Sequence, residues 1–230
     1  MLIPITIGYD GDRKIVNDLV DLDHLLVYIS EEQMSSMISY SLPGYMDKIY
    51  ETIKNKNYTL FPLYFYLKNG TNMARVRYWI REYYKNMEDR YDLFIKEKCK
   101  SIDEYNNTHR KKLEHIVLLL YGYPNSEYLS RNEIEDKLTH IMQLGRAAGI
   151  HIIIITDEIN NMCDGVLLNF VNKICTRKDV DKEMFYLSDG FELQDNELVY
   201  DCSNNEDTMV LNFKKEDYME ENQWRRKQKV

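Results

Sequence analysis

Residues 144–156 read LGRAAGIHIIIIT, and they join the end of a helix to the start of a buried strand. Helical spacing of apolar residues runs up to Leu144, and Gly149 is a residue type that commonly ends a helix. The run that follows is continuously apolar and rich in β-branched residues, which is typical of a strand buried on both faces. A helix that leads directly into such a strand predicts an α/β protein.

Four further apolar runs have strand character and are separated by helical segments. They are residues 24–29, 58–67, 116–121 and 172–176. Pro62 lies inside the second run and predicts an edge or bulged strand, because proline cannot donate to a ladder. Continuous apolar strands that alternate with helices predict a mainly parallel sheet with helices on both faces.

The helices and the C-terminal strands have signals of their own. Apolar residues three or four apart predict a long helix over 73–94, and capping boxes at 30–33 and 130–133 predict two further helix starts. Residues 193–200, with Asp195-Asn196 in the middle, predict a hairpin, and 208–213 predict another strand. We expect these last segments to add antiparallel strands at one sheet edge.

Composition limits the class of protein. The 230 residues are 44% hydrophobic, which suits one α/β domain, and 38 acidic residues outnumber 30 basic ones. The acidic balance weighs against a surface that tracks nucleic acid. The four cysteines form no CxxC pair, so no metal site is expected. We expect no membrane span, and the abrupt start in a strand-like run suggests a piece of a longer protein.

Several phrases, in the same order along the chain, resemble the FtsK/SpoIIIE family of motor ATPases. They are ITIGYDGDRKIVNDLVD (5–21), DHLLV (23–27), MEDRYDLF (87–94) followed by IDEYN (102–106), and LGRAAGIH (144–151). The resemblance implies a P-loop NTPase-like fold of the RecA/FtsK type over residues 1–230 as a single domain. It implies an N-terminal hairpin over 1–22, an edge hairpin and strand over 191–215, and a tail over 216–230.

The nucleotide-binding loop of the family is altered here. The family runs from its HLLV strand into a glycine-rich loop that ends in Gly-Lys-Ser/Thr and cradles phosphates. In this chain the same register reads SEEQMSS after Ile29, without a glycine or a lysine. The residues of this degenerate site are Ser30, Glu31, Glu32, Ser35 and Ser36. Ser35 stands in place of the lysine, the two glutamates add negative charge, and Ser36 alone keeps the family's residue type.

The family's metal-binding strand is altered as well. Residues 116–120 supply its apolar run, but Tyr121-Gly122 follow where the family has Asp-Glu. No carboxylate is then left to hold Mg²⁺ or to polarise the attacking water. The Asp157-Glu158 pair ends the next run and could be mistaken for this position, but the RAAGIH phrase assigns it to the following strand.

Several residues remain candidates for a partner site or pocket. Tyr121, Gly122 and Tyr123 either line a repurposed pocket at the carboxyl edge of the sheet or form a turn with packing tyrosines. Arg146 is either an interface or phosphate ligand or a solvated arginine at a helix end. Asp157 and Glu158 make at most a weak metal site and otherwise belong to a solvated loop or an acidic rim. His24 and His151 are either pH switches or hydrogen-bonded residues at strand ends.

The resemblance further implies a role in type VII secretion, whose membrane-bound coupling ATPases carry tandem FtsK/SpoIIIE domains with an eroded last domain. It implies a catalytically inactive pseudo-ATPase on the cytoplasmic side of the membrane, with no cofactor, that recognises or regulates export substrates. The partners implied are WXG-type substrates and neighbouring ATPase domains of the same chain. Three alternatives stay open: a slow ATPase that still binds ATP and Mg²⁺, a DNA-translocase fragment, and a structural domain that stacks on an active neighbour.

Overall fold

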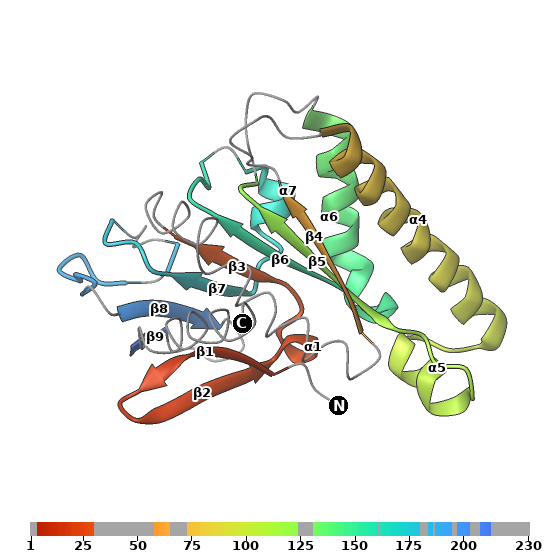
Figure 1. Ribbon diagram of the computed structural model, residues 1–230, viewed down its shortest axis with the longest axis horizontal. Coiled ribbons are helices and arrows are strands. Elements are labelled where there is room, and N and C mark those ends of the chain that lie inside the picture. The colour runs from red at the N-terminus through yellow and green to blue at the C-terminus, as the bar shows by residue number, and fades with distance from the viewer. Residues whose placement is uncertain are drawn as a thin grey trace, which may run out of the picture.

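The computed structural model describes residues 4–29, 58–64, 73–123, 131–160, 162–179, 184–185, 187–194, 197–202 and 208–212. Within these residues a nine-stranded mixed sheet forms the centre of the molecule (Figure 1). The strands are β1 (Pro4–Asp10), β2 (Arg13–Asp18), β3 (Leu25–Tyr28), β4 (Tyr58–Tyr64), β5 (His115–Tyr121), β6 (Ile150–Thr156), β7 (Asn172–Cys175), β8 (Glu197–Cys202) and β9 (Met209–Asn212). Their order across the sheet is β2-β1-β9-β8-β7-β3-β6-β5-β4.

One half of the sheet is parallel and corresponds to the five apolar runs. In the order β7-β3-β6-β5-β4, each strand is paired in parallel with its neighbour. Every residue of β5 and β6 is buried, as expected for strands covered on both faces. Pro62 pairs with Leu119 from β4, which lies at the edge of the described sheet. The edge position predicted from that proline is therefore confirmed.

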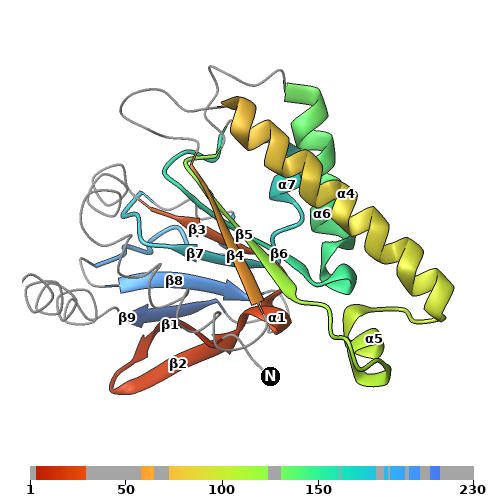
Figure 2. The ribbon, with the colours of Figure 1, turned by 45° about the vertical axis from the view of Figure 1, so that its right-hand side comes forward.

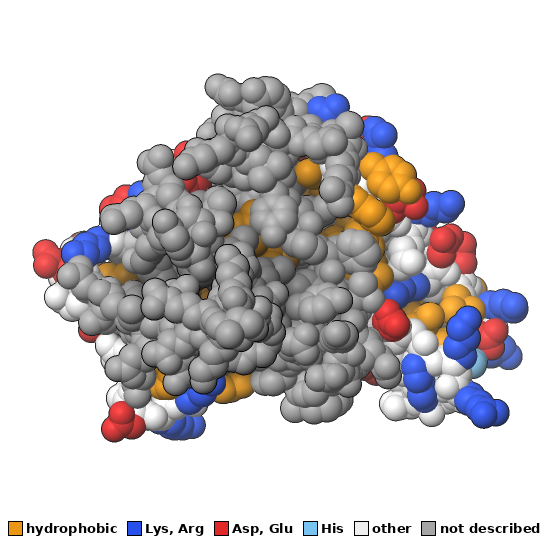
Figure 3. Space-filling model, in the orientation of Figure 1, with side chains coloured by type: hydrophobic (Ala, Val, Ile, Leu, Met, Phe, Trp, Pro, Cys, Tyr) orange, Lys and Arg blue, Asp and Glu red, His pale blue; other side chains and the backbone are white. Residues whose placement is uncertain are grey.

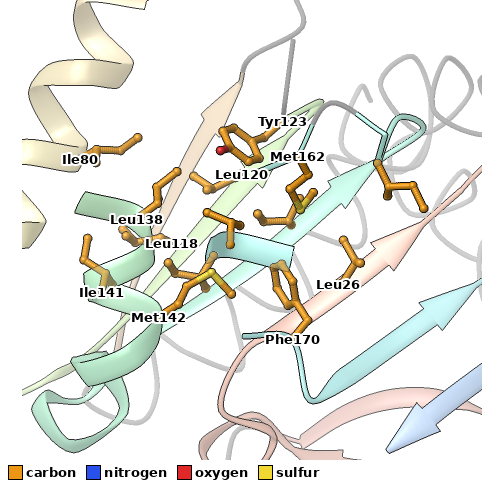
Figure 4. Close-up of a cluster of buried hydrophobic side chains, with 14 of the residues drawn as sticks. Leu26, Ile80, Leu118, Leu120, Tyr123, Leu138, Ile141, Met142, Met162 and Phe170 are labelled. Atoms are coloured by element: carbon orange, nitrogen blue, oxygen red, sulfur yellow. The ribbon is translucent and has the colours of Figure 1, made fainter. Parts of the chain in front are cut away.

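The described helices are α1 (Leu19–Leu22), α4 (Met73–Glu97), α5 (Ile102–Thr108), α6 (Arg131–Ala148) and α7 (Asp164–Leu167). Figure 2 shows α4 lying over α6, with α6 and α7 against one face of the parallel strands. Leu118 and Leu120 of β5 meet Leu138 and Ile141 of α6 in the core between these layers (Figure 4). The side chains of the opposite face are buried as well: Leu25, Val117, Leu119, Ile153 and Ile155.

Gly149 ends α6 and lets the chain turn directly into β6. Its φ is +74°, in the left-handed region that favours glycine. A Cβ at this position would lie 2.4 Å from Cδ1 of Ile102, a buried residue of α5. Both the backbone conformation and the close approach of α5 therefore require glycine here.

The other half of the sheet is antiparallel. β1 and β2 form the N-terminal hairpin, β8 pairs with β7 and β9, and β1 pairs with β9 at Tyr9 and Asn212. The hairpin predicted within 193–200 is wrong in extent, because β8 begins at Glu197 and its hairpin partner is β9. Residues 191–194 form no strand, and the amide of Glu197 donates to the carbonyl of Gln194 (3.1 Å).

A buried ion pair joins the two halves. Lys173 of β7 lies directly opposite Asp201 of β8, and its Nζ contacts Oδ2 of that carboxylate. Both side chains are almost fully excluded from solvent, and the ring of Phe185 lies 5.9 Å from the ammonium group. None of the helices in the described ranges is long and apolar enough to span a membrane.

Candidate functional site

β3 and β6 are neighbours in the sheet, but the connections that leave them run to opposite sides. From β3 the chain continues to β4 at one edge, whereas from β6 it crosses to β7 on the other side of β3. In open parallel sheets such an arrangement leaves a crevice outside the carboxyl ends of the two strands, where ligands bind. The candidate site therefore lies where β3, β6 and their neighbours end.

The ends of these strands are held level by backbone hydrogen bonds that continue past the ladders. The bonds run from the amide of Ile29 to the carbonyl of Thr156 (2.9 Å), from Thr176 to Tyr28 (3.0 Å), and from Gly122 to Ile155 (2.8 Å). The carboxyl ends of β5, β6, β3 and β7 thus form one continuous rim.

Arg177 ties three of these strand ends together. Its Nη1 donates to the carbonyl of Asp157 (2.8 Å), and its guanidinium carbon lies 4.7 Å from the centre of the Tyr28 ring. Its Nε donates to Oδ1 of Asp179 (2.8 Å), and Nη2 contacts the other carboxylate oxygen. This bidentate bond raises the pKa of Arg177 and lowers the pKa of Asp179. A guanidinium committed in this way can bind a phosphate only if Asp179 moves aside.

The end of β6 is a compact turn. The buried Thr156 accepts a hydrogen bond at Oγ1 from the amide of Glu158 (3.0 Å) and donates from Oγ1 to the carbonyl of the same residue (2.9 Å). The carboxylate of Glu158 accepts from the amide of Asn160 (2.9 Å). Asp157 and Glu158 are half-buried. Among the described residues no group of three or more His, Cys, Asp or Glu side chains could hold a metal ion.

The end of β5 is closed by aromatic packing. Tyr121 and Tyr123 are both fully buried, and Tyr123 belongs to the core between β5 and the helices (Figure 4). Gly122 between them has a φ of +65°, a conformation that β-branched or bulky residues adopt only with strain. The stretch 115–123 contains no carboxylate. The structure thus places both tyrosines in the interior at this end of the rim.

Arg146 lies at the amino ends of the parallel strands, on the side of the sheet opposite to the rim. It is in the last turn of α6, its side chain is largely exposed, and its Nη1 is 3.7 Å from Oδ2 of Asp23, which precedes β3. The sequence had grouped it with Tyr123, Asp157 and Glu158. The structure brings those three to one rim and leaves Arg146 at the amino ends of the strands.

Buried histidines also occupy the amino edge. Nε2 of His24 donates to the carbonyl of Met142 (2.8 Å). His151 bonds the carbonyl of Asp23 through Nδ1 and Nδ1 of His115 through Nε2, both at 3.1 Å. Burial lowers the pKa of His24, that of His115 to about 4 and that of His151 to about 3. These rings are therefore neutral at physiological pH and act as hydrogen-bonded residues at strand ends.

The degenerate loop residues fall outside the described part of the chain: Ser30, Glu31, Glu32, Ser35 and Ser36. Sequence reasoning missed Arg177 and Asp179. The signal that could have found them is their position directly after the strand predicted at 172–176, at the carboxyl edge.

No family model matches the chain. Among curated proteins, the DNA translocase FtsK of Oceanobacillus iheyensis is 37% identical over 82 residues, which is 31% of this chain and 10% of that protein. FtsK of Leptospira interrogans is 29% identical over 179 residues, 68% of this chain and 19% of that protein. The chain thus spans a tenth to a fifth of the length of these relatives.

Solved structures extend the similarity to the whole fold. The chain of EssC (ATPases 2 and 3) from Geobacillus thermodenitrificans superimposes with a TM-score of 0.70 at 13% identity, over 91% of this chain and 43% of that one. This chain has the FtsK-type ATPase fold. The pCW3 conjugation coupling protein TcpA, solved with ATPγS, shares this FtsK-type fold with a TM-score of 0.70 at 14% identity, over 97% of this chain and 70% of that one.

A third structure with the FtsK-type fold contains a peptide. It is Thermomonospora curvata EccC (ATPases 2 and 3) in complex with a signal sequence peptide, with a TM-score of 0.64 at 14% identity. It covers 92% of this chain, which in turn covers 42% of it. The expectation of an FtsK-type domain is thus confirmed at the level of the fold.

Proposed function

We propose that this chain is a pseudo-ATPase domain of a type VII secretion motor of the EssC kind, and that it recognises or regulates export substrates. The pseudo-ATPase part of this proposal rests on the residues found at the end of β5. A motor of this fold needs a carboxylate there to position Mg²⁺ and the attacking water. Tyr121 and Gly122 stand there instead, and the tyrosine side chain is packed in the interior.

The phosphate side supports the same proposal. After β3 the sequence has neither the glycines nor the lysine that grip a triphosphate, and Glu31 and Glu32 add repulsion. Loss of the lysine contact and the added carboxylates each cost on the order of 1–3 kcal/mol of anion binding. Arg177, a cation at the rim, is bound to Asp179. Catalytic residues are therefore not assigned, and neither ATP nor Mg²⁺ is proposed as a cofactor.

The recognition half of the proposal rests on proteins that share the fold. EccC with this fold has been solved in complex with a signal sequence peptide. EssC and EccC chains carry more than one ATPase domain. We extend both properties to this chain, with WXG-type substrates and neighbouring ATPase domains as partners. Its proposed location is the cytoplasmic side of the cell membrane, as part of a longer membrane protein.

The first experiment measures ATP directly. The 230-residue chain is titrated with a fluorescent ATP analogue and Mg²⁺, and phosphate release is followed in parallel. We expect neither micromolar binding nor turnover. Turnover that disappears in Ser36→Ala would refute the pseudo-ATPase and establish a slow ATPase, because Ser36 is the one loop residue that keeps the family's metal-binding type.

The second experiment separates protein from DNA as the partner, since the curated relatives are DNA translocases. WXG-type substrates with their C-terminal segments, and duplex DNA, are each tested by thermal shift and by direct binding. We expect stabilisation by a substrate and weak or no DNA binding. A DNA affinity that falls steeply with salt, without substrate binding, would favour the translocase alternative. Binding of neither would leave the stacking role and overturn recognition.

A further inference from the structure

A cluster of basic side chains occupies one end of the molecule, although the whole chain carries a net charge of −8. It covers the end of α4, the following α5 and the segment before β5, and it is seen as blue atoms at the right of Figure 3. All of its basic residues are exposed, and we call them the basic lobe: Lys96, Lys98, Lys100, Arg110, Lys111 and Lys112. None of them forms an ion pair with another described residue.

Two of the four acidic side chains in the same region, those of Glu97 and Glu104, hold the local fold together. Oε2 of Glu97 lies 3.3 Å from Nε2 of His109 and fixes α5 against α4. Oε2 of Glu104 accepts from the amide of Lys100 (2.7 Å), and the amide of Glu104 donates to Oγ of the N-cap residue Ser101 (3.3 Å). Because these two carboxylates serve the local fold, they do not neutralise the ammonium groups around them. Of those groups, Lys112 donates to the carbonyl of Asn106, and the others remain available to an outside anion.

Lys98 is present in spite of a backbone that favours glycine. At the end of α4 the amide of Cys99 donates to the carbonyl of Phe94 (2.9 Å), and the amide of Lys98 donates to that of Ile95 (3.3 Å). This is the Schellman pattern, whose left-handed residue is usually glycine, and Lys98 has a φ of +57°. Non-glycine residues with this backbone conformation are enriched at functional sites. Here that side chain adds a charge to the basic lobe.

An apolar side chain stands among these charges. Ile95 is 75% exposed and lies three residues before Lys98, on the same side of the helix end. The lobe's tyrosine, Tyr105, is buried and stacked on His109 at 4.0 Å, so it offers no exposed ring to a nucleic-acid base. Lysines around an exposed isoleucine match the two layers of a bilayer surface, with phosphates outside and hydrocarbon beneath.

We propose that the basic lobe docks on a membrane surface that contains anionic lipid headgroups. The lysines and Arg110 lie against the headgroup phosphates, and Ile95 enters the interfacial layer. The inference rests on the lobe alone and does not depend on the proposed secretion role. The lobe lies at the amino ends of β5 and β6, so docking leaves the rim at their carboxyl ends facing away from the bilayer.

The test is vesicle binding by the complete chain. Vesicles of phosphatidylcholine mixed with phosphatidylglycerol are compared with phosphatidylcholine alone, by cosedimentation at increasing salt. Each basic side chain near an anionic surface is expected to contribute about fivefold to partitioning. Lys96→Gln/Lys111→Gln should then weaken binding about 25-fold. The matched control Arg13→Gln/Lys14→Gln removes the same charge from the exposed β1–β2 hairpin and should change binding less than about twofold.

Two single variants sharpen the test. Lys98→Gly should raise the melting temperature, because glycine relieves the strain, and yet weaken vesicle binding about fivefold. Ile95→Ser should weaken binding to vesicles while leaving any DNA binding unchanged. Equal binding to neutral and anionic vesicles, or an equal loss in the hairpin control, would overturn the proposal. So would tight DNA binding that the lobe variants abolish, without vesicle binding.

Discussion

Replacement of Asp201 by alanine is expected to destabilise the fold by about 3–5 kcal/mol, because it leaves the ammonium group of Lys173 buried without its carboxylate. The two side chains are only 11% and 5% exposed, so water can replace little of the lost interaction. They also face each other in register on β7 and β8, the strands that join the parallel and antiparallel halves. A loss of this size is a large fraction of the 5–15 kcal/mol that typically holds a domain together.

The measurement is urea unfolding followed by circular dichroism, with the double variant Lys173→Met/Asp201→Leu as the matched control. Removal of both charges leaves no unpaired charge in the interior. The double variant should therefore be within about 1–2 kcal/mol of the parent or more stable. The reasoning fails if Asp201→Ala costs less than about 1 kcal/mol, which is the range of an exposed pair. It also fails if the double variant is as unstable as the single one.

Two further predictions concern the amino edge of the sheet. Since burial lowers the pKa of His115 to about 4 and of His151 to about 3, their contribution to stability should be complete above the unfolded value of 6.5. Stability should fall as the pH drops from 6.5 to about 4, by on the order of 3 kcal/mol from His115 alone, as measured by urea titrations at each pH. A flat profile would contradict this expectation. Gly149→Ala should cost about 2–4 kcal/mol, from a left-handed backbone and from contact with Ile102. Gly11→Ala, at φ +58° in open space, should show the backbone part alone, and equal losses would refute the contact.

Most of the parallel half of the sheet was predictable because β3, β4, β5 and β6 are marked by largely apolar runs. All five runs became strands, and the periodicity from Met73 to Phe94 became α4. The antiparallel half of the sheet was only partly predictable from the sequence. Lys173 and Asp201 interrupt the apolar pattern of β7 and β8. A single sequence cannot show that two charges 28 residues apart pair with each other in the interior.

The rim was harder to predict than the fold. The position of Tyr121 and Gly122 at the end of β5 followed from the length of the apolar run, but their burial depended on how the helices pack above them. Arg146 lies within a recognisable phrase, LGRAAGIH, yet its place at the end of α6 puts it at the amino ends of the strands, opposite to the rim. Arg177 belongs to no phrase at all, and only the pairing of β7 with β3 brings it over Tyr28.

The pairing of β1 with β9 has a consequence for how the protein is made. Tyr9 meets Asn212, so the ribosome must add some 200 residues between the two partners. At usual elongation rates the β1–β2 hairpin therefore lacks its partner strand β9 for about 10–40 s. During that time the backbone groups of β1 that face β9 are unpaired, and an exposed strand edge of this kind can pair with another chain. The strand that closes it is the last of the described strands to leave the ribosome. A nascent chain that stalls before β9 would thus present an unfinished sheet to chaperones and proteases.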